Sequence, residues 1–122
     1  MGCQLGQIVK TLLFLADERP TLVLVAGDRR VDPAALAQIL GVRRKRLRMA
    51  SPEEVLALTG FVVGGLPPVG HTGTYDVVLD ESLRRFRRLW AAAGTPDAVF
   101  ETSPDELAEI TGGQWSEITK QP

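Results

Sequence analysis

The sequence predicts an α+β fold, in which a mixed, mainly antiparallel and curved sheet carries three short helices. Two observations lead to this class. Short runs rich in Val, Leu, Ile and Phe outnumber the helix-like segments, and several runs are joined by short turn signals. Three segments begin with Ser or Asp followed by Pro, an order typical of a helix N-terminus. Such strands and helices pack as a sheet covered by helices.

A β-hairpin and a helix are predicted in the first third of the chain. Residues 8–16 and 21–26 are strand-like, and the turn signal DERP separates them. Asp32 then has the position of an N-cap, with Pro33 at the first helical position. We expect this helix to cover residues 34–40 and to end at Gly41.

Two later helices start from nearly the same sequence. SPEEVLALTG begins at Ser51 with a capping box, and SPDELAEITG begins at Ser103. Two interpretations stay open: repeated use of one efficient helix start, or an internal duplication, which the flanking sequences do not support. The remaining strand candidates are residues 43–49, 77–79, 86–92, 98–101 and 114–118, with a turn signal at 94–97 and a turn or one helical turn at 80–83.

Length and composition exclude several classes of protein. A chain of 122 residues predicts one domain, and 44% hydrophobic with 24% charged residues is typical of a globular chain. No apolar run approaches the ~20 residues of a membrane helix, and no signal peptide is recognisable. One Cys and one His cannot form a disulfide or a typical zinc site, so we expect no metal, no cofactor and a cytoplasmic location.

The net charge of −1 conceals an uneven distribution. Nine of the 14 basic residues fall in two runs, at positions 43–48 and 84–88, whereas the last 26 residues carry six acids and one Lys. Basic clusters suit nucleic-acid phosphates. The alternative is a solvated face that the acidic C-terminal stretch balances, and the aromatic residues near the second run, Phe86 and Trp90, are only a weak signal for nucleic acid.

Lys10 is the first candidate for a functional residue. On a strand it shares a face with Leu12 and Phe14, where a lysine without a partner is costly to bury. One interpretation is a strand-end lysine whose ammonium reaches water. The other is a lysine at the floor of a pocket, where it holds a phosphate or a carbonyl.

The segment GGLPPVGHTG, residues 64–73, is the second candidate. It has neither the P-loop nor the dinucleotide-binding spacing, although its glycines allow backbone N–H groups to approach a ligand. Pro67 and Pro68 have fixed φ angles and no N–H, so they suit a rigid wall. His71 has a pKa suited to acid–base work, but no Ser or Cys nucleophile is recognisably paired with it, and it can equally be a loop residue without a role.

The ordered set of segments resembles the YbaK/prolyl-tRNA synthetase-associated editing domain family. The resemblance runs from about Gln7 to Ile118, through QIVKTLLF, LVLVAGDRRVD, ALAQILG, RMASPEEVLALTGFVVGGLPPVGH, VLDESL, AAAGTPD and SPDELAEITG. It implies a barrel-like mixed sheet and a trans-acting hydrolase that cleaves the ester of a mischarged tRNA in translation quality control, Cys- or Ala-tRNA(Pro) above all. The implied partners are the aminoacylated 3′ end of a tRNA and prolyl-tRNA synthetase, with no membrane.

The resemblance also implies a set of site residues. Lys10 matches the strand lysine that is important for activity. The substrate-binding residues are the Gly/Pro loop with the histidine that follows it, and a second small-residue turn: Gly64, Gly65, Leu66, Pro67, Pro68, His71, Gly94, Thr95 and Pro96. In this scheme water, the 2′-hydroxyl of the tRNA or a substrate thiol attacks the ester.

The sequence departs from the family pattern before the first strand. Family members usually carry a further stretch there, whereas six residues precede Gln7. We therefore expect residues 1–122 to form a single editing-type domain that is short at its N-terminus, with apolar surface that favours a homodimer. Two alternatives to a deacylase stay open: a non-catalytic tRNA- or RNA-binding module and a protein-interaction domain.

Overall fold

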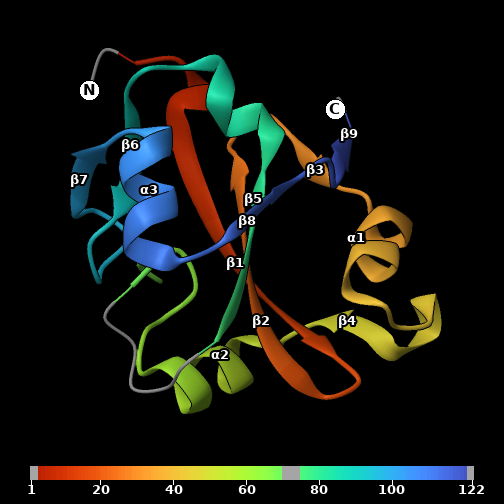
Figure 1. Cartoon of the computed structure of the whole chain (residues 1–122). Coiled ribbons are helices and arrows are strands. Elements are labelled where there is room, and N and C mark those ends of the chain that lie inside the picture. Colours follow the sequence, from red (N-terminus) through yellow and green to blue (C-terminus); the bar gives the residue numbers. More distant parts are fainter. Residues whose placement is uncertain (1–2, 70–74, 121–122) are drawn as a thin grey trace.

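A long antiparallel hairpin forms the centre of the fold. The computed structural model describes residues 3–69 and 75–120, and in it β1 (Ile8–Ala16) pairs with β2 (Arg19–Ala26) over eight positions. Asp17 and Glu18 form the turn and have φ angles of 49° and 65°, as a type I′ turn requires of both central residues. The predicted hairpin is confirmed, with a tighter turn than DERP implied because Arg19 and Pro20 already belong to β2 (Figure 1).

A mixed sheet is built outward from this hairpin. The strand order is β7–β6–β1–β2–β5–β8, with β4 beside β1. The β1–β6, β2–β5 and β5–β8 pairings are parallel, and the β1–β2, β1–β4 and β6–β7 pairings are antiparallel. The added strands are β4 (Leu47–Met49), β5 (Asp76–Asp80), β6 (Leu89–Ala92), β7 (Val99–Thr102) and β8 (Gln114–Ser116). A separate ribbon pairs β3 (Arg30–Val31) with β9 (Thr119–Lys120).

The three predicted helices are present, and each begins where the sequence signals it. They are α1 (Pro33–Leu40), α2 (Pro52–Thr59) and α3 (Pro104–Thr111). The side chains of Asp32, Ser51 and Ser103 accept hydrogen bonds from backbone N–H groups in the first turns, and glycines in the left-handed conformation follow each helix. Short 3₁₀ turns are η1 (Leu5–Gln7), η2 (Arg44–Arg46) and η3 (Glu81–Arg85).

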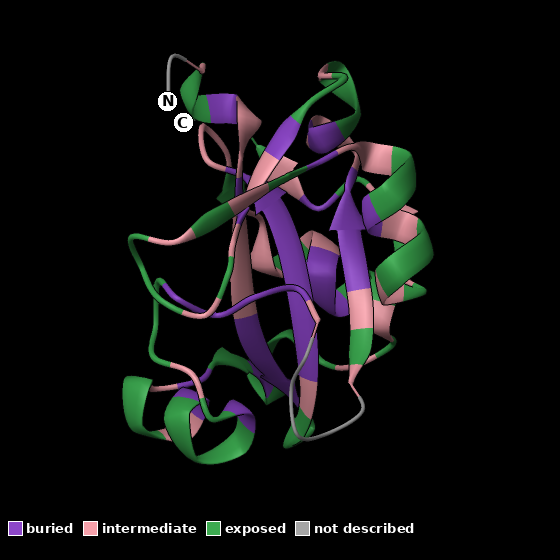
Figure 2. Ribbon diagram, turned by 90° about the vertical axis from the view of Figure 1, so that its left-hand side faces the viewer, coloured by how far each residue is buried: buried purple, intermediate pink, exposed green. Residues whose placement is uncertain are grey.

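The helices cover both faces of the sheet, because β1 buries side chains on both of its faces. Val9, Leu13 and Leu15 pack into a cluster that also contains Val55 of α2 and Leu107 of α3. Leu12, Phe14 and Ala16 point the other way, toward the cluster that contains Leu36 and Ala37 of α1. Figure 2 shows the resulting buried centre, and Figure 1 shows α1 and α3 on opposite sides of the hairpin. The predicted α+β class with a mixed sheet and three helices is confirmed.

Three predicted strands are shorter than expected, and two of them overlap the basic runs; the third, predicted at 114–118, is β8, which ends at Ser116. Of residues 43–49 only β4 is a strand, since residues 44–46 form η2. Of residues 86–92 only β6 is a strand. Each strand begins only where β1 offers an edge: β4 lies beside Phe14 to Ala16, and β6 lies beside Ile8 and Val9. Among the described residues, no helix is long and apolar enough to cross a bilayer.

Candidate functional site

The Lys10 ammonium group is held by the backbone of a neighbouring turn. Its Nζ donates a hydrogen bond of 2.7 Å to the carbonyl oxygen of Arg29, which follows β2. Partial burial lowers the pKa of Lys10, Asp28 opposes this shift, and the charge of Arg30 adds to it. A lysine ammonium has three N–H donors, so two remain available to a ligand. Lys10 is therefore fixed in position, in contrast to a lysine that only reaches into water.

Lys10 lines an open groove of about 440 Å³ that we call the cationic groove. Its other lining residues are Leu12, Phe14, Arg30, Val31, Pro33, Arg44, Leu47, Arg48 and Met49. Apolar side chains from β1, β3 and β4 form most of its surface, and within the described part of the chain the four basic residues are the only charged residues that line it. The volume falls within the range typical of small-molecule sites. Such a lining suits a ligand that combines an apolar or aromatic part with anionic groups.

The Gly/Pro loop is packed into the fold on the other face of β1. Gly65, Leu66, Pro67 and Pro68 are buried, and Gly64 is exposed. The Leu66 side chain joins the cluster formed by Val9 and Leu13, whereas Lys10 projects from the opposite face of the strand. The N–H of Gly65 donates to the carbonyl oxygen of Val62 at 3.0 Å, which closes a turn within the loop.

The second predicted turn lies directly against the Gly/Pro loop. The N–H of Gly94 donates to the carbonyl oxygen of Gly65 at 3.1 Å. A Cβ atom on Gly65 would lie 2.8 Å from the Cα of Thr95, and one on Gly64 would lie 3.7 Å from the Pro96 ring. The structure thus joins the two segments that the sequence predicted separately. His71 lies outside the described residues.

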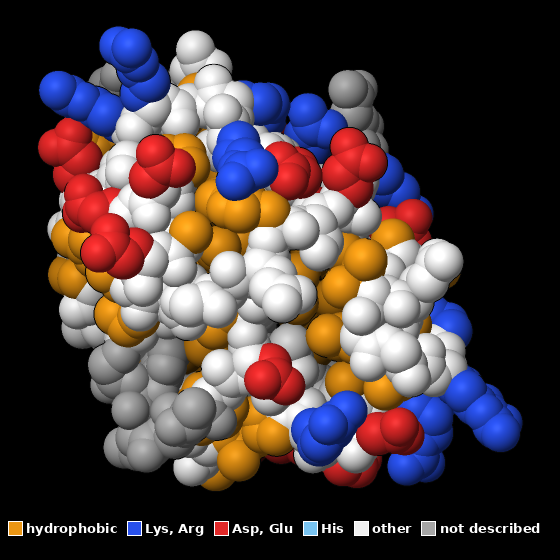
Figure 3. All heavy atoms as spheres, in the orientation of Figure 1, with side chains coloured by type: hydrophobic (Ala, Val, Ile, Leu, Met, Phe, Trp, Pro, Cys, Tyr) orange, Lys and Arg blue, Asp and Glu red, His pale blue; other side chains and the backbone are white. Residues whose placement is uncertain are grey.

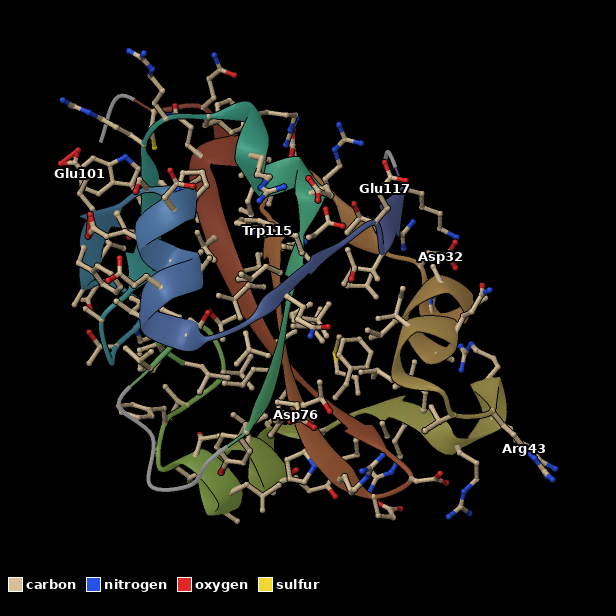
Figure 4. All side chains as sticks on the ribbon, in the orientation of Figure 1. Asp32, Arg43, Asp76, Glu101, Trp115 and Glu117 are labelled. Carbon is tan, nitrogen blue, oxygen red and sulfur yellow. The ribbon has the colours of Figure 1, made fainter. Side chains whose placement is uncertain are left out.

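Most of the two basic runs is neutralised by nearby acids. The ion pairs are Arg46–Asp17, Arg48–Glu18, Arg48–Glu54, Arg84–Glu81, Arg85–Asp28 and Arg88–Glu101. Of these acids, only Glu101 belongs to the acidic C-terminal stretch. The alternative in which this stretch balances the basic runs therefore holds for the Arg88–Glu101 pair and is wrong for the other pairs. Side chains of Lys and Arg alternate with acids over the surface in Figure 3. Arg43 is different, because it extends away from the fold into solvent (Figure 4).

Three arginines of the cationic groove, Arg30, Arg44 and Arg48, were missed as site residues from sequence. Arg30 lies on β3 and Arg44 lies in η2, far from Lys10 along the chain. Among the described residues neither Arg30 nor Arg44 makes an ion pair with a carboxylate, and Arg44 donates only a 3.4 Å hydrogen bond to the carbonyl oxygen of Leu47. The shared face of Lys10, Leu12 and Phe14 and the basic run at 43–48, which contains Arg44 and Arg48, were the signals that pointed to this groove.

The described ranges contain no cluster of three or more His, Cys, Asp or Glu side chains able to hold a metal ion. The polar groups that the structure does bring to the two candidate regions are cations and backbone amides. They are suited to binding negative charge, whether on a phosphate or on an oxygen that becomes charged during a reaction.

Comparison with known proteins decides the family. The model of the aminoacyl-tRNA editing domain matches residues 1–110. The chain belongs to the aminoacyl-tRNA editing domain family. This confirms the resemblance found in the sequence.

The relatives of this editing domain include proteins named for tRNA editing. YwhH of Bacillus subtilis is 34% identical, with 98% of this chain and 76% of YwhH covered. The "Putative Cys-tRNA(Pro)/Cys-tRNA(Cys) deacylase EbsC" of Enterococcus faecalis is 28% identical, with 98% and 72% covered. The crystal structure of "a putative trans-editing enzyme for prolyl tRNA synthetase" is 43% identical in sequence and has a TM-score of 0.92. The match covers 98% of this chain and 74% of that chain.

Proposed function

We propose that this editing domain is a trans-acting aminoacyl-tRNA deacylase that hydrolyses Cys- or Ala-tRNA(Pro). The observation that carries the proposal is Lys10, a half-buried cation fixed on the carbonyl oxygen of Arg29 in an open groove of a family member. The names of EbsC and of the trans-editing structure support an ester of a proline tRNA as the substrate and prolyl-tRNA synthetase as a partner.

The reaction is the addition of water to the ester carbonyl. The carbonyl oxygen becomes negatively charged, the bond to the ribose oxygen breaks, and the amino acid and a free hydroxyl of the terminal ribose are released. The domain has to bind the terminal nucleotide and to stabilise the oxyanion. We assign the first task to Lys10, whose two remaining N–H donors can hold a phosphate or ribose oxygen. The attacking group is water, the 2′-hydroxyl of the tRNA or the thiol of the substrate.

We assign the oxyanion to backbone N–H groups of the Gly/Pro loop. Because this loop packs on the face of β1 opposite to Lys10, the ester has to pass the edge of β1 at residues 10–13, with which neither β6 nor β4 pairs. Gly65 is not available, because its N–H already donates to Val62. Gly64 and Leu66 remain, since no described residue accepts a hydrogen bond from the N–H of either one. The buried Pro67 and Pro68 then form the rigid wall that excludes a larger amino acid. The turn of Gly94, Thr95 and Pro96 packs against the loop and supports it.

Deacylation of mischarged tRNA(Pro) tests this function. Ala-, Cys- and Ser-tRNA(Pro) are incubated with the wild type, with Lys10→Ala and with Lys45→Ala, and the remaining ester is followed with time. Lys45 is a matched control, because it is an exposed cation in η2 that does not line the groove. Lys10 is assigned to binding the terminal nucleotide, and a hydrogen bond to a charged group contributes about 1.5–3 kcal/mol. We therefore expect kcat/KM to fall roughly 10- to 100-fold in Lys10→Ala, mainly through KM, and a wild-type rate in Lys45→Ala.

The other outcomes separate the alternatives. An unchanged rate in Lys10→Ala would remove Lys10 from the mechanism. Binding of tRNA without any loss of ester by the wild type would favour the non-catalytic RNA-binding module. Absence of tRNA binding at low salt would instead favour a protein-interaction domain.

A further inference from the structure

The cationic groove continues well beyond Lys10, along the same face of β1. Lys10 and Phe14 both line it and are four residues apart, which is about 13 Å on a strand. Arg30 lies at the Lys10 end, because Lys10 is bonded to the carbonyl of the preceding residue. Arg44 lies at the other end, because it donates to the carbonyl of Leu47, which is paired with Ala16. The groove therefore has unpaired positive charge at both ends.

The charges of Arg30 and Arg44 are available to a ligand, unlike most of the arginines in the basic runs. Arg48, which also lines the groove, is already bonded to Glu54 at 2.8 Å and to Glu18 at 3.0 Å. The side chain of Arg30 makes no hydrogen bond or ion pair with any described residue, and the side chain of Arg44 makes only its weak bond to a carbonyl. Both arginines are exposed. Two free guanidinium groups beside one groove attract anions and repel other cations.

The surface between the two arginines is apolar and open to solvent. Leu12, Val31, Leu47 and Met49 contribute to it, and Met49 is 54% exposed despite being a large hydrophobic residue. Exposed apolar surface beside arginines suits a nucleobase, which has an apolar face, next to its charged backbone. A single phosphate or a free carboxylate would use only the arginines and leave this surface exposed to water.

We propose that Arg30 and Arg44 bind two backbone phosphates of the single-stranded 3′ end of a tRNA, with a base lying on the apolar surface between them. This rests on the proposed function, since it continues the path of the terminal nucleotide that Lys10 binds. Arg30 and Arg44 are positioning residues: they do not touch the reacting ester, and they set how the end of the tRNA enters the site.

Binding of a short RNA tests the proposal without any ester chemistry. A fluorescent single-stranded RNA ending in CCA is titrated with wild type, Arg30→Gln, Arg44→Gln and Arg43→Gln at several salt concentrations. Each phosphate contact contributes about 0.7 to the slope of log K against log salt for a single strand. We expect a slope smaller by about 0.7 in Arg30→Gln and in Arg44→Gln. Arg43→Gln is the matched control with the same loss of charge, since Arg43 is adjacent to Arg44 but does not line the groove.

The outcomes distinguish this inference from the proposed function. Slopes equal to that of wild type in both groove variants, or equal reductions in all three variants, would overturn it even if the protein hydrolyses mischarged tRNA. AMP binding as tightly as the RNA would also overturn it, because a mononucleotide cannot use two phosphate sites. In the deacylation assay the groove variants should raise KM by about the factor lost in RNA affinity and leave kcat unchanged.

Discussion

Substitution of Gly65 by alanine tests whether the Gly/Pro loop depends on its contact with the turn at residues 94–96. Gly65 does not have a positive φ angle, so the backbone itself tolerates alanine. The obstacle is steric, because the new Cβ would lie 2.8 Å from the Cα of Thr95 and 2.9 Å from the carbonyl oxygen of Gly94. Both are backbone atoms, so the two segments have to separate and strain their 3.1 Å hydrogen bond.

The expected loss of stability follows from this overpacking. Inserting an extra carbon into a well-packed site typically costs about 1–3 kcal/mol. Unfolding entropy of about 2.1 cal/mol/K per residue gives roughly 260 cal/mol/K for a chain of 122 residues. We therefore expect Gly65→Ala to lower Tm by about 4–12 °C. Deacylation of Cys- or Ala-tRNA(Pro), measured well below the Tm of the variant, should fall because the loop is displaced.

Gly41→Ala is the control for stability alone. Gly41 follows α1 with a φ of 70°, and a Cβ there would meet no heavy atom within 4 Å. The substitution costs backbone strain of roughly 1–2 kcal/mol. The Tm of Gly41→Ala should therefore fall by an amount within the range expected for Gly65→Ala, while deacylation stays at the wild-type rate. A Gly65→Ala variant that melts with the wild type would refute the tight contact. One that is destabilised but hydrolyses the ester normally would refute the role of the loop in the pocket.

Two further predictions concern carboxylates with defined partners. The Arg48 guanidinium, with a smaller effect from the Ser51 N–H, lowers the pKa of Glu54 from 4.5 to about 2. Because this pKa is depressed on folding, the pair stabilises the fold above about pH 4.5 and loses this effect as the pH falls toward 2. In an NMR titration, Arg48→Gln should return the titration midpoint of Glu54 toward 4.5. An unchanged midpoint would contradict the pairing of Glu54 with Arg48. Asp80, which is 2% exposed, accepts hydrogen bonds from the Ile118 N–H at 2.9 Å and the Thr119 hydroxyl at 2.7 Å. Asp80→Asn replaces one acceptor with a donor, so the free energy of unfolding should fall by about 1–3 kcal/mol in thermal unfolding. Hydrogen exchange at the Ile118 amide should become faster. Exchange as slow as in wild type would show that other contacts hold the C-terminal ribbon.

Local signals made the helices and the hairpin predictable. The Asp-Pro and Ser-Pro starts at positions 32, 51 and 103 act through bonds within a few residues, so they are readable directly in the sequence. The β1–β2 register follows from one two-residue turn. The ends of β4 and β6 were misjudged because they depend on where β1, a distant segment, offers an edge for pairing.

The candidate site was predictable only in its separate parts. Lys10, the Gly/Pro loop and the Gly94 turn stood out by residue type and by resemblance. The sequence did not show that the Gly65 N–H is used within its own turn, or that the loop packs on the face of β1 opposite to Lys10. Both facts depend on the path of the backbone and on which face of a shared strand each segment meets.

The sequence by itself determined the three helices of this protein, their caps, the central hairpin and the family, because each of these is encoded in short runs of neighbouring residues, whereas the β3–β9 ribbon was not predicted. Only the tertiary structure decided which charges are neutralised. Asp28 reaches Arg85 across 57 positions and Asp17 reaches Arg46 across 29, whereas Arg30 and Arg44 line the cationic groove without an ion pair to any described residue. Ion pairing acts over a few ångströms in space, and distance along the chain does not reveal which residues come that close.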